Sequence, residues 1–257
     1  MRLTYTFLLI PFFFLAACTS TAPQQSSQSI PMGNPPAEGF DVQGSDPKAV
    51  EIADAVMEAL GGRSNWDATR YIKWDFFGNR TLTWDKYENR VRIDIPRDSM
   101  VILVNAITVT GKVFQGKNEV THADSLAKYL ERGRRIWIND SYWLAMPFKL
   151  KDSGVTLTYV GEETTQAGVS ADKLELRFKA VGVTPQNKYH VWVDKTSHLI
   201  TQWAYYANAT DAEPRFINPW SDYRTYGKIL LSGDRGGRKL ENIAVFEELP
   251  AAVFESR

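Results

Sequence analysis

The sequence is poor in the residues from which metal and redox centres are commonly built. It holds one cysteine, Cys18, and three histidines among 257 residues. A single cysteine excludes intramolecular disulfides, CxxC redox pairs, cysteine-based zinc sites and iron–sulfur clusters. The motifs GxSxG, HExxH, GxxxxGK and GxGxxG and the EF-hand loop are also missing. We therefore predict no metal site, no cofactor and no catalytic residues of these types.

Charge of one sign is missing as well. The chain has 30 basic and 30 acidic side chains, and a mature chain that begins at Cys18 would lose only Arg2, which leaves a net charge of −1. Without a positive field we expect no nucleic-acid partner. A chain of this length can bury roughly 70% of its unfolded surface, so one large domain is expected.

The N-terminus has the pattern of a secretory signal peptide, with Arg2, an apolar run over 7–15 and small residues before Cys18. The apolar run is shorter than the roughly 20 residues of a membrane-spanning helix. Leu15-Ala16-Ala17-Cys18 resembles the bacterial lipobox, whose cysteine becomes lipid-modified. An ordinary signal peptide with an incidental cysteine is the alternative. By the same resemblance, Thr19 in place of Asp favours the outer membrane.

Three regions are predicted along the chain: a lipoprotein signal peptide over 1–17, a lipidated Cys18 with a disordered tether over 18–44, and a single half-barrel ligand-binding domain over 45–257. The tether is rich in Ser, Thr, Gln, Pro and Gly and has too few apolar residues to fold. As a flexible coil it would hold the domain about 30 Å from the bilayer. The expected location is the cell envelope, lipid-anchored at the outer membrane and facing the periplasm.

The folded region is predicted to begin with a helix and to continue mostly as strands. Asp46-Pro47 and Gly61-Gly62 mark the start and the end of the helix. A second, amphipathic helix is expected over 124–135, where Gly133 weakens its end. Short runs rich in aromatic and β-branched residues predict antiparallel strands. The expected strands lie near 69–77, 80–87, 89–95, 100–104, 107–115, 155–161, 172–180, 188–194, 199–207, 224–232 and 239–248.

Side-chain alternation indicates which strand faces are buried. Over 90–95 and 173–179 one face is apolar and the other charged, whereas 70–77 is apolar on both faces. A curved sheet with helices in its concavity accounts for both patterns. His190 falls on an alternation with charged neighbours, which predicts a solvent-facing, non-catalytic histidine. The segment 141–148 is too apolar for a loop and contains Pro147, so we expect it to plug or cover an apolar interior.

Two further features allow more than one interpretation. Arg132, Arg134 and Arg135 with Lys128 form a basic cluster that is either the wet side of a surface helix or a contact for anionic lipid headgroups. Eight tryptophans serve mostly as core, and a minority of them would line a pocket for an apolar ligand.

The chain is similar to the bacterial lipoprotein-localisation (Lol-type) carrier and receptor superfamily, in its poorly characterised branch of envelope lipoproteins. The resemblance covers roughly 46–254 and rests on short stretches in a common order. These stretches are Ala59-Leu60-Gly61-Gly62 with Trp66, the segment from Asn139 to Leu150, Val191 to Thr196, Trp220 to Arg224, and Leu240 to Phe254. It implies a mainly β (α+β) fold: an open, curved antiparallel sheet, an incomplete half-barrel, with helices that cover a hydrophobic concavity. It also implies an apolar ligand, such as a lipid or an acylated molecule.

The leading hypothesis is a non-enzymatic, lipid-anchored protein that binds such a ligand in the concavity. The expected ligand-binding residues are Trp74, Phe76, Tyr142, Trp143, Met146, Phe148 and Trp203. The alternative is a structural or interaction lipoprotein with a filled interior, for which Tyr205-Tyr206 and the region 216–223 are candidate protein-binding anchors. A hydrolase that uses two carboxylates leaves no sequence motif and stays open as a third hypothesis. The identities of the ligand and of any protein partner are left open.

Overall fold

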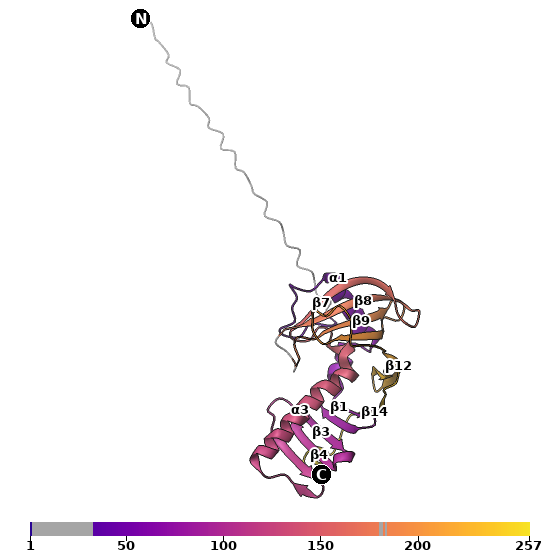
Figure 1. Cartoon of the computed structure of the whole chain (residues 1–257). Coiled ribbons are helices and arrows are strands. Elements are labelled where there is room, and N and C mark those ends of the chain that lie inside the picture. Colours follow the sequence, from indigo (N-terminus) through magenta and orange to yellow (C-terminus); the bar gives the residue numbers. More distant parts are fainter. Residues whose placement is uncertain (2–32, 180–181, 183) are drawn as a thin grey trace. The chain divides into compact units, whose positions relative to one another are not determined.

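The computed structural model describes residues 33–179, 182 and 184–257, together with Met1 (Figure 1). Residues Pro31–Arg257 form one compact unit. The predicted signal peptide, Cys18 and the first part of the predicted tether lie outside the described residues.

The larger sheet is antiparallel and has seven strands, in the order β14-β1-β2-β3-β4-β5-β6. Along its central strands, alternate residues such as Ile93 and Ile102 are fully buried because they face the core. The strands are β1 (Tyr71–Phe76), β2 (Arg80–Asp85), β3 (Arg90–Ile95), β4 (Met100–Asn105), β5 (Gly111–Gln115), β6 (Asn118–Glu119) and β14 (Leu240–Phe246).

The second sheet is also antiparallel and has five strands, in the order β11-β10-β9-β8-β7. Its inner face, defined here as the face that carries Tyr189 and Trp203, belongs to the main core. Its outer face carries a smaller cluster around Trp192 and Tyr206. The strands are β7 (Val155–Thr164), β8 (Ser170–Phe178), β9 (Lys188–Asp194), β10 (Ile200–Tyr206) and β11 (Phe216–Pro219).

The single strand expected over 224–232 is wrong. The chain instead forms a separate hairpin of β12 (Ser221–Tyr226) and β13 (Ile229–Asp234). Gly227 has a φ of 61°, a left-handed conformation that turns the chain back on itself. The strand expected to start at 107 starts at Gly111, because Asn105 to Thr110 form a turn.

Helix α1 (Pro47–Ala59) confirms the first expected helix, and α2 (Arg63–Ala68) follows it directly. The second expected helix is much longer than predicted, since α3 runs from Ala123 to Ala145. It continues through Gly133, where a Cβ atom would lie 2.7 Å from Ile102 Cγ2, so glycine permits the close approach of helix and strand. The short helix η2 (Met146–Lys149) follows at the proline.

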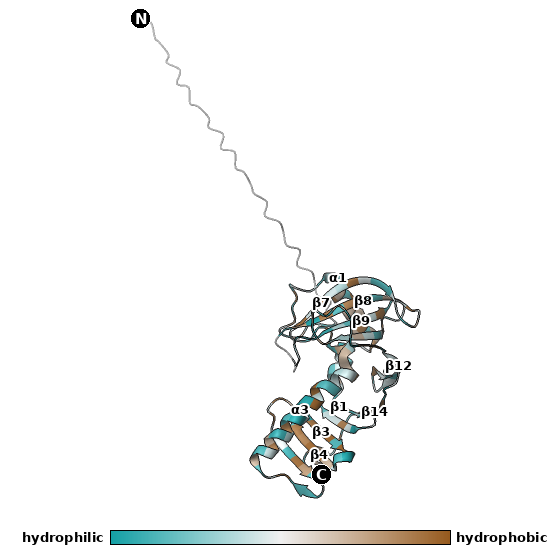
Figure 2. Ribbon diagram, in the orientation of Figure 1, coloured by the Kyte–Doolittle hydropathy of each residue, from teal (hydrophilic) through white to brown (hydrophobic). Residues whose placement is uncertain are grey.

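The two sheets are covered by different helices. Helix α3 packs on β4 and β5, and its C-terminal end reaches the inner face of the second sheet, while α1 packs on β7 (Figure 1). Figure 2 shows apolar residues concentrated on the strands beside α3 and hydrophilic residues along much of the helix. Among the described residues no sheet closes on itself. The fold is therefore mainly β, with open antiparallel sheets and covering helices, which confirms the predicted class of an incomplete half-barrel.

The opposite face of the larger sheet is covered in part by the C-terminus. Phe254, in the short helix η3 (Ala251–Phe254), stacks on Tyr71 at 6.0 Å between ring centroids. Arg92 on β3 donates hydrogen bonds to the carbonyl oxygens of Val253 and Ser256. The expectation that the strand near 70–77 is covered on both faces is thus confirmed.

The end of the predicted tether is part of the folded unit. Phe40 is buried in the main core, and the backbone amide of Asp41 donates to the carbonyl of Val155. Lys151 Nζ donates to the carbonyl of Asn34 across 2.6 Å. The boundary expected at residue 45 is therefore too late, because Phe40 supplies an apolar anchor that the polar composition of the segment conceals.

Candidate functional site

The residues predicted to bind a ligand lie in the protein interior. Tyr142 is half-buried, and the side chains of the other six are at most 8% exposed. They come from both sheets, from α3 and from η2, so the fold brings together residues that are distant in the sequence. The six are Trp74, Phe76, Trp143, Met146, Phe148 and Trp203.

Three of the predicted residues form one aromatic cluster. Trp143, near the end of α3, meets Trp203 of β10 edge to face at 4.7 Å between centroids. Phe76 of β1 approaches Trp143 in the same manner at 6.4 Å. The cluster lies where α3 crosses from one sheet to the other.

Phe148 lies in a separate aromatic group. Its ring stacks on Trp66 of α2 at 4.2 Å, and Trp66 in turn meets Trp84 of the larger sheet. This contact closes the core beneath α2. The segment 141–148 thus covers the apolar interior as predicted, but as the end of α3 and the start of η2.

A row of four half-buried rings extends from the cluster of Trp143 and Trp203 across the inner face of the second sheet, and we call it the aromatic ladder. Its members lie on four adjacent strands: Phe178 on β8, Tyr189 on β9, Tyr205 on β10 and Phe216 on β11. Successive ring centroids are 5.3, 5.5 and 5.3 Å apart. These spacings are those of favourable aromatic pairs.

The fold continues the ladder into the buried cluster. Trp143 stacks on Phe216 at 5.6 Å, and Tyr142 lies 5.3 Å from Tyr189. Tyr142, Trp143 and Trp203 were predicted to bind a ligand, and Tyr205 and the region 216–223 to bind a protein, whereas Phe178 and Tyr189 were not singled out. Tyr189 carries a signal that would have found it, because it alternates along β9 with Lys188 and His190 of the outer face.

Burial keeps Tyr189 of the ladder and the neighbouring Tyr142 uncharged. Burial raises the pKa of Tyr189 to about 12, and burial raises the pKa of Tyr142 well above its ordinary value of 10.0. The hydroxyl of Tyr142 and Nε1 of Trp203 have no hydrogen-bond partner among the described residues. The result is an apolar surface behind which two donors are buried without a partner.

The candidate protein-binding anchors separate in the structure. Tyr205 and Phe216 belong to the ladder and are paired in register. Tyr206 points to the outer face, where it is buried, and Trp220 is 1% exposed. Tyr206 and Trp220 are therefore buried, whereas the other positions of the expected anchor region are half-buried or exposed.

The prediction that His190 faces solvent is wrong, because the residue is 9% exposed. Its Nε2 lies 3.0 Å from the Glu175 carboxylate and its Nδ1 lies 3.0 Å from the Tyr206 hydroxyl. Burial lowers its pKa below the ordinary 6.5, although the hydrogen bond to Glu175 opposes this. A neutral ring that donates from Nε2 and accepts at Nδ1 satisfies both contacts.

Arg235, which the sequence analysis did not single out, is buried at the end of α3. It is 1% exposed, lies 3.4 Å above the ring of Trp220, and donates to the carbonyl oxygen of Trp143 across 2.7 Å. Burial lowers the pKa of Arg235 to about 9. The guanidinium thus holds one of the free carbonyls that end a helix.

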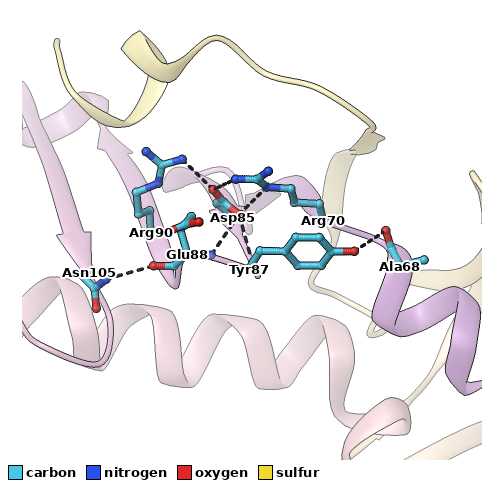
Figure 3. A network of polar contacts seen from close by, with 7 residues as sticks. All are labelled: Ala68, Arg70, Asp85, Tyr87, Glu88, Arg90 and Asn105. Atoms are coloured by element: carbon cyan, nitrogen blue, oxygen red, sulfur yellow. Dashed lines mark hydrogen bonds and ion pairs between the residues drawn. The ribbon is translucent and has the colours of Figure 1, made fainter.

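Two buried carboxylates, Asp85 and Asp140, form ion pairs with arginines. Asp85 is fully buried and pairs with Arg70 and Arg90, and its Oδ1 accepts hydrogen bonds from the amides of Tyr87 and Glu88 (Figure 3). This network fixes the turn between β2 and β3.

Asp140 of α3 pairs with Arg80 at 2.6 Å. Burial raises the pKa of Asp140, and the hydrogen bonds from Arg80 only partly offset this. The ion pair fastens the helix to the start of β2.

Two hollows lie away from the predicted ligand residues. One, of about 800 Å³, runs along α3, and the other, of about 430 Å³, lies between the outer face of the larger sheet and the C-terminus. None of the seven predicted residues lines either hollow. In the part of the chain that the structure describes, no three His, Cys, Asp or Glu side chains gather as a metal-binding group. No described helix combines the length and the apolar character needed to span a bilayer.

Comparison with known proteins found similarity to solved structures alone. No protein-family model matches the sequence, and no curated protein matches it. Among solved structures, the crystal structure of a DUF1329 family protein from Desulfovibrio piger is similar, with a TM-score of 0.43 and 14% identity. The match covers 82% of this chain and 98% of that one. A similarity of this size assigns neither a family nor a function.

Proposed function

We propose that this chain is a lipid-anchored, non-catalytic envelope protein that binds an apolar ligand, a lipid or an acylated molecule, on the inner face of its second sheet. The observation that carries the proposal is the aromatic ladder. Its rings are half-buried, whereas their neighbours Trp143 and Trp203 are almost completely enclosed. Half-buried rings beside a closed core offer an apolar surface to a ligand, and no core side chain has to be displaced.

The chemistry of the ladder suits an acyl group. Stacked rings supply an apolar wall, and each buried CH₂ of a chain contributes about 0.8 kcal/mol. The hydroxyl of Tyr142 and Nε1 of Trp203 are buried donors without a partner among the described residues, and an ester or amide carbonyl would reach them only where the ligand displaces the rings that cover them. We therefore propose that the ligand contacts the aromatic ladder, beside the seven interior residues, rather than those residues themselves.

The anchor is the second part of the proposal. It rests on the resemblance of Leu15 to Cys18 to a lipobox, and on Cys18 being the sole cysteine of the chain. Attachment at the outer membrane, on its periplasmic side, would keep the domain close to lipids without embedding it.

One observation favours the alternative, a structural or interaction lipoprotein. The predicted ligand residues pack against one another, as Trp143 does with Trp203 and Phe148 with Trp66, which is the filled interior expected of that class. A protein partner would then use Tyr205 and Phe216 as aromatic anchors.

Mass spectrometry separates the two functions and checks the anchor. The compact unit Pro31–Arg257, secreted and purified without detergent from a bacterial lysate, is extracted with organic solvent, and the intact mass of the full mature chain is recorded. The proposal predicts a stoichiometric lipid in the extract and the added mass of acyl groups on Cys18. An empty extract together with failure to bind an apolar probe would shift the weight to a protein partner, and an unmodified Cys18 would remove the anchor.

A further inference from the structure

One side of α3 carries a hollow of about 800 Å³ in which four of the eight lining residues are cationic, and we call it the cationic hollow. Lys128, Arg132 and Arg135 lie at positions i, i+4 and i+7 of the helix and therefore share one face. All three are exposed. The hollow is lined by Arg80, Lys128, Tyr129, Glu131, Arg132, Arg135, Ile136 and Asn139.

The positive charge of the cationic hollow is only partly neutralised. Arg80 is paired with buried Asp140 at 2.6 Å, and Arg132 with Asp98 at 2.9 Å. Glu131, the single acidic residue of the lining, is itself held by Arg134 at 3.0 Å.

Lys128 and Arg135 are different. Neither forms an ion pair within 4.0 Å among the described residues, although Arg135 lies within electrostatic reach of Glu131. Two positive charges therefore line the hollow with only partial compensation. The complete sequence carries equal numbers of acidic and basic side chains, which makes this excess a local feature.

The floor of the hollow has apolar character. Tyr129 and Ile136 line it and are half-buried against the core. Arg80, which also lines the hollow, lies over the ring of Phe76 at 4.6 Å, and Phe76 contacts Trp143. Cationic groups above an apolar floor match a molecule that carries an anionic head and an apolar body.

We propose that the cationic hollow binds the phosphate headgroup of an anionic membrane lipid. Arginine and lysine are the side chains that bind phosphate through charge-assisted hydrogen bonds. The choice of a lipid over a soluble phosphate rests on the apolar floor and on the proposed anchor, which would keep the domain near the bilayer. The hollow and its charges are independent of any ligand at the aromatic ladder.

The test compares two double variants of the full mature chain in a nonionic detergent. Lys128→Glu with Arg135→Glu reverses the two free charges of the hollow. Lys117→Glu with Lys228→Glu is the matched control, because both lysines are exposed, lie outside the lining of the hollow and give the same change in net charge. Isothermal titration is carried out with dioctanoyl phosphatidate, with zwitterionic dioctanoyl phosphatidylcholine and with inorganic phosphate.

The expected result is that the unmodified chain binds phosphatidate more tightly than either other probe. The hollow variant should bind phosphatidate about tenfold or more weakly, and the control variant should match the unmodified chain. Equal weakening in both variants, or no preference for phosphatidate over phosphatidylcholine, would overturn the proposal. Inorganic phosphate that binds as tightly as phosphatidate would overturn the lipid as its source.

Failure of this inference and failure of the proposed function are distinguishable. If the hollow variant loses phosphatidate binding and no form of the chain binds a neutral apolar probe, the headgroup site is supported and the ladder site is not. If all variants bind the apolar probe equally and none prefers phosphatidate, the ladder site is supported and the headgroup site is not.

Discussion

At the scale of the residue, Arg235 shows how a charge is tolerated in the core. It has no carboxylate partner among the described residues, and its donors go instead to the carbonyls of Trp143 and Ser232 and to the Ser232 hydroxyl. Stacking on Trp220 covers the flat face of the guanidinium. Its position therefore depends on the end of α3, and a sequence alone does not reveal such a contact.

His190 makes the stability of the protein depend on pH. Burial lowers its pKa in the folded state below 6.5, so the unfolded chain binds a proton more readily. The free energy of unfolding should thus be highest above about pH 7 and should fall as the pH drops through 6.5 toward the folded-state pKa. Lys173 and Lys188 face the ring and add to the cost of its protonation, whereas Glu175 reduces that cost.

Urea unfolding of the unit Pro31–Arg257 at pH 7.5 and 5.5 checks this. His190→Gln should lose much of the difference between the two pH values, and His198→Gln, at an exposed turn, should keep it. The same pH dependence in the His190 variant and the unmodified protein would contradict the assignment.

At the scale of the element, α3 is the helix on which the arrangement depends. Its first half packs on β4 and β5, and its last turn supplies Tyr142 and Trp143 to the inner face of the second sheet. The sequence predicted two segments here, a helix over 124–135 and a plug over 141–148, because Gly133 has a low helix propensity and Pro147 breaks a helix. Tertiary packing overrides the glycine, and the helix ends two residues before the proline.

The close approach at Gly133 is testable. A side chain at this position would lie 2.7 Å from Ile102 Cγ2 and 3.3 Å from Val104 Cγ1. Gly133→Val should therefore lower the free energy of unfolding by about 1–3 kcal/mol, despite the better helix propensity of valine. Ala127→Val, on the exposed side of the same helix, should change it by less than about 0.7 kcal/mol. Equal effects in urea unfolding would show that the contact with β4 is looser than described.

At the scale of the whole molecule, periodicity predicted most of the strands, and the resemblance implied the class of the fold. Alternation identified Val91, Ile93 and Ile95 as one buried face, and both flanking motifs of α1 were correct. The hairpin β12–β13 was missed because Gly227, with a neighbouring lysine, is a weak turn signal between an aromatic run and an aliphatic one.

Site prediction reached less far than fold prediction. Buried Trp203 and half-buried Tyr205 belong to the same strand and have the same aromatic character, so the sequence cannot order them by exposure. His190 was misplaced for a related reason. Alternation shows on which face of the sheet a residue lies, but it does not show whether other residues cover that face. Here the long side chains of Lys173 and Lys188 lie over rings of the outer face.

The most direct test of the central claim is the affinity of the aromatic ladder for an apolar fluorescent probe, N-phenyl-1-naphthylamine. Tyr205→Glu places a charge on the half-buried ladder, and Tyr87→Glu places the same charge on a tyrosine that is 55% exposed. The account predicts that the unmodified protein binds the probe, that Tyr205→Glu binds it at least about tenfold more weakly because a carboxylate is costly to bury, and that Tyr87→Glu is unchanged. Equal binding by both folded variants, or no binding by the unmodified protein, would contradict it.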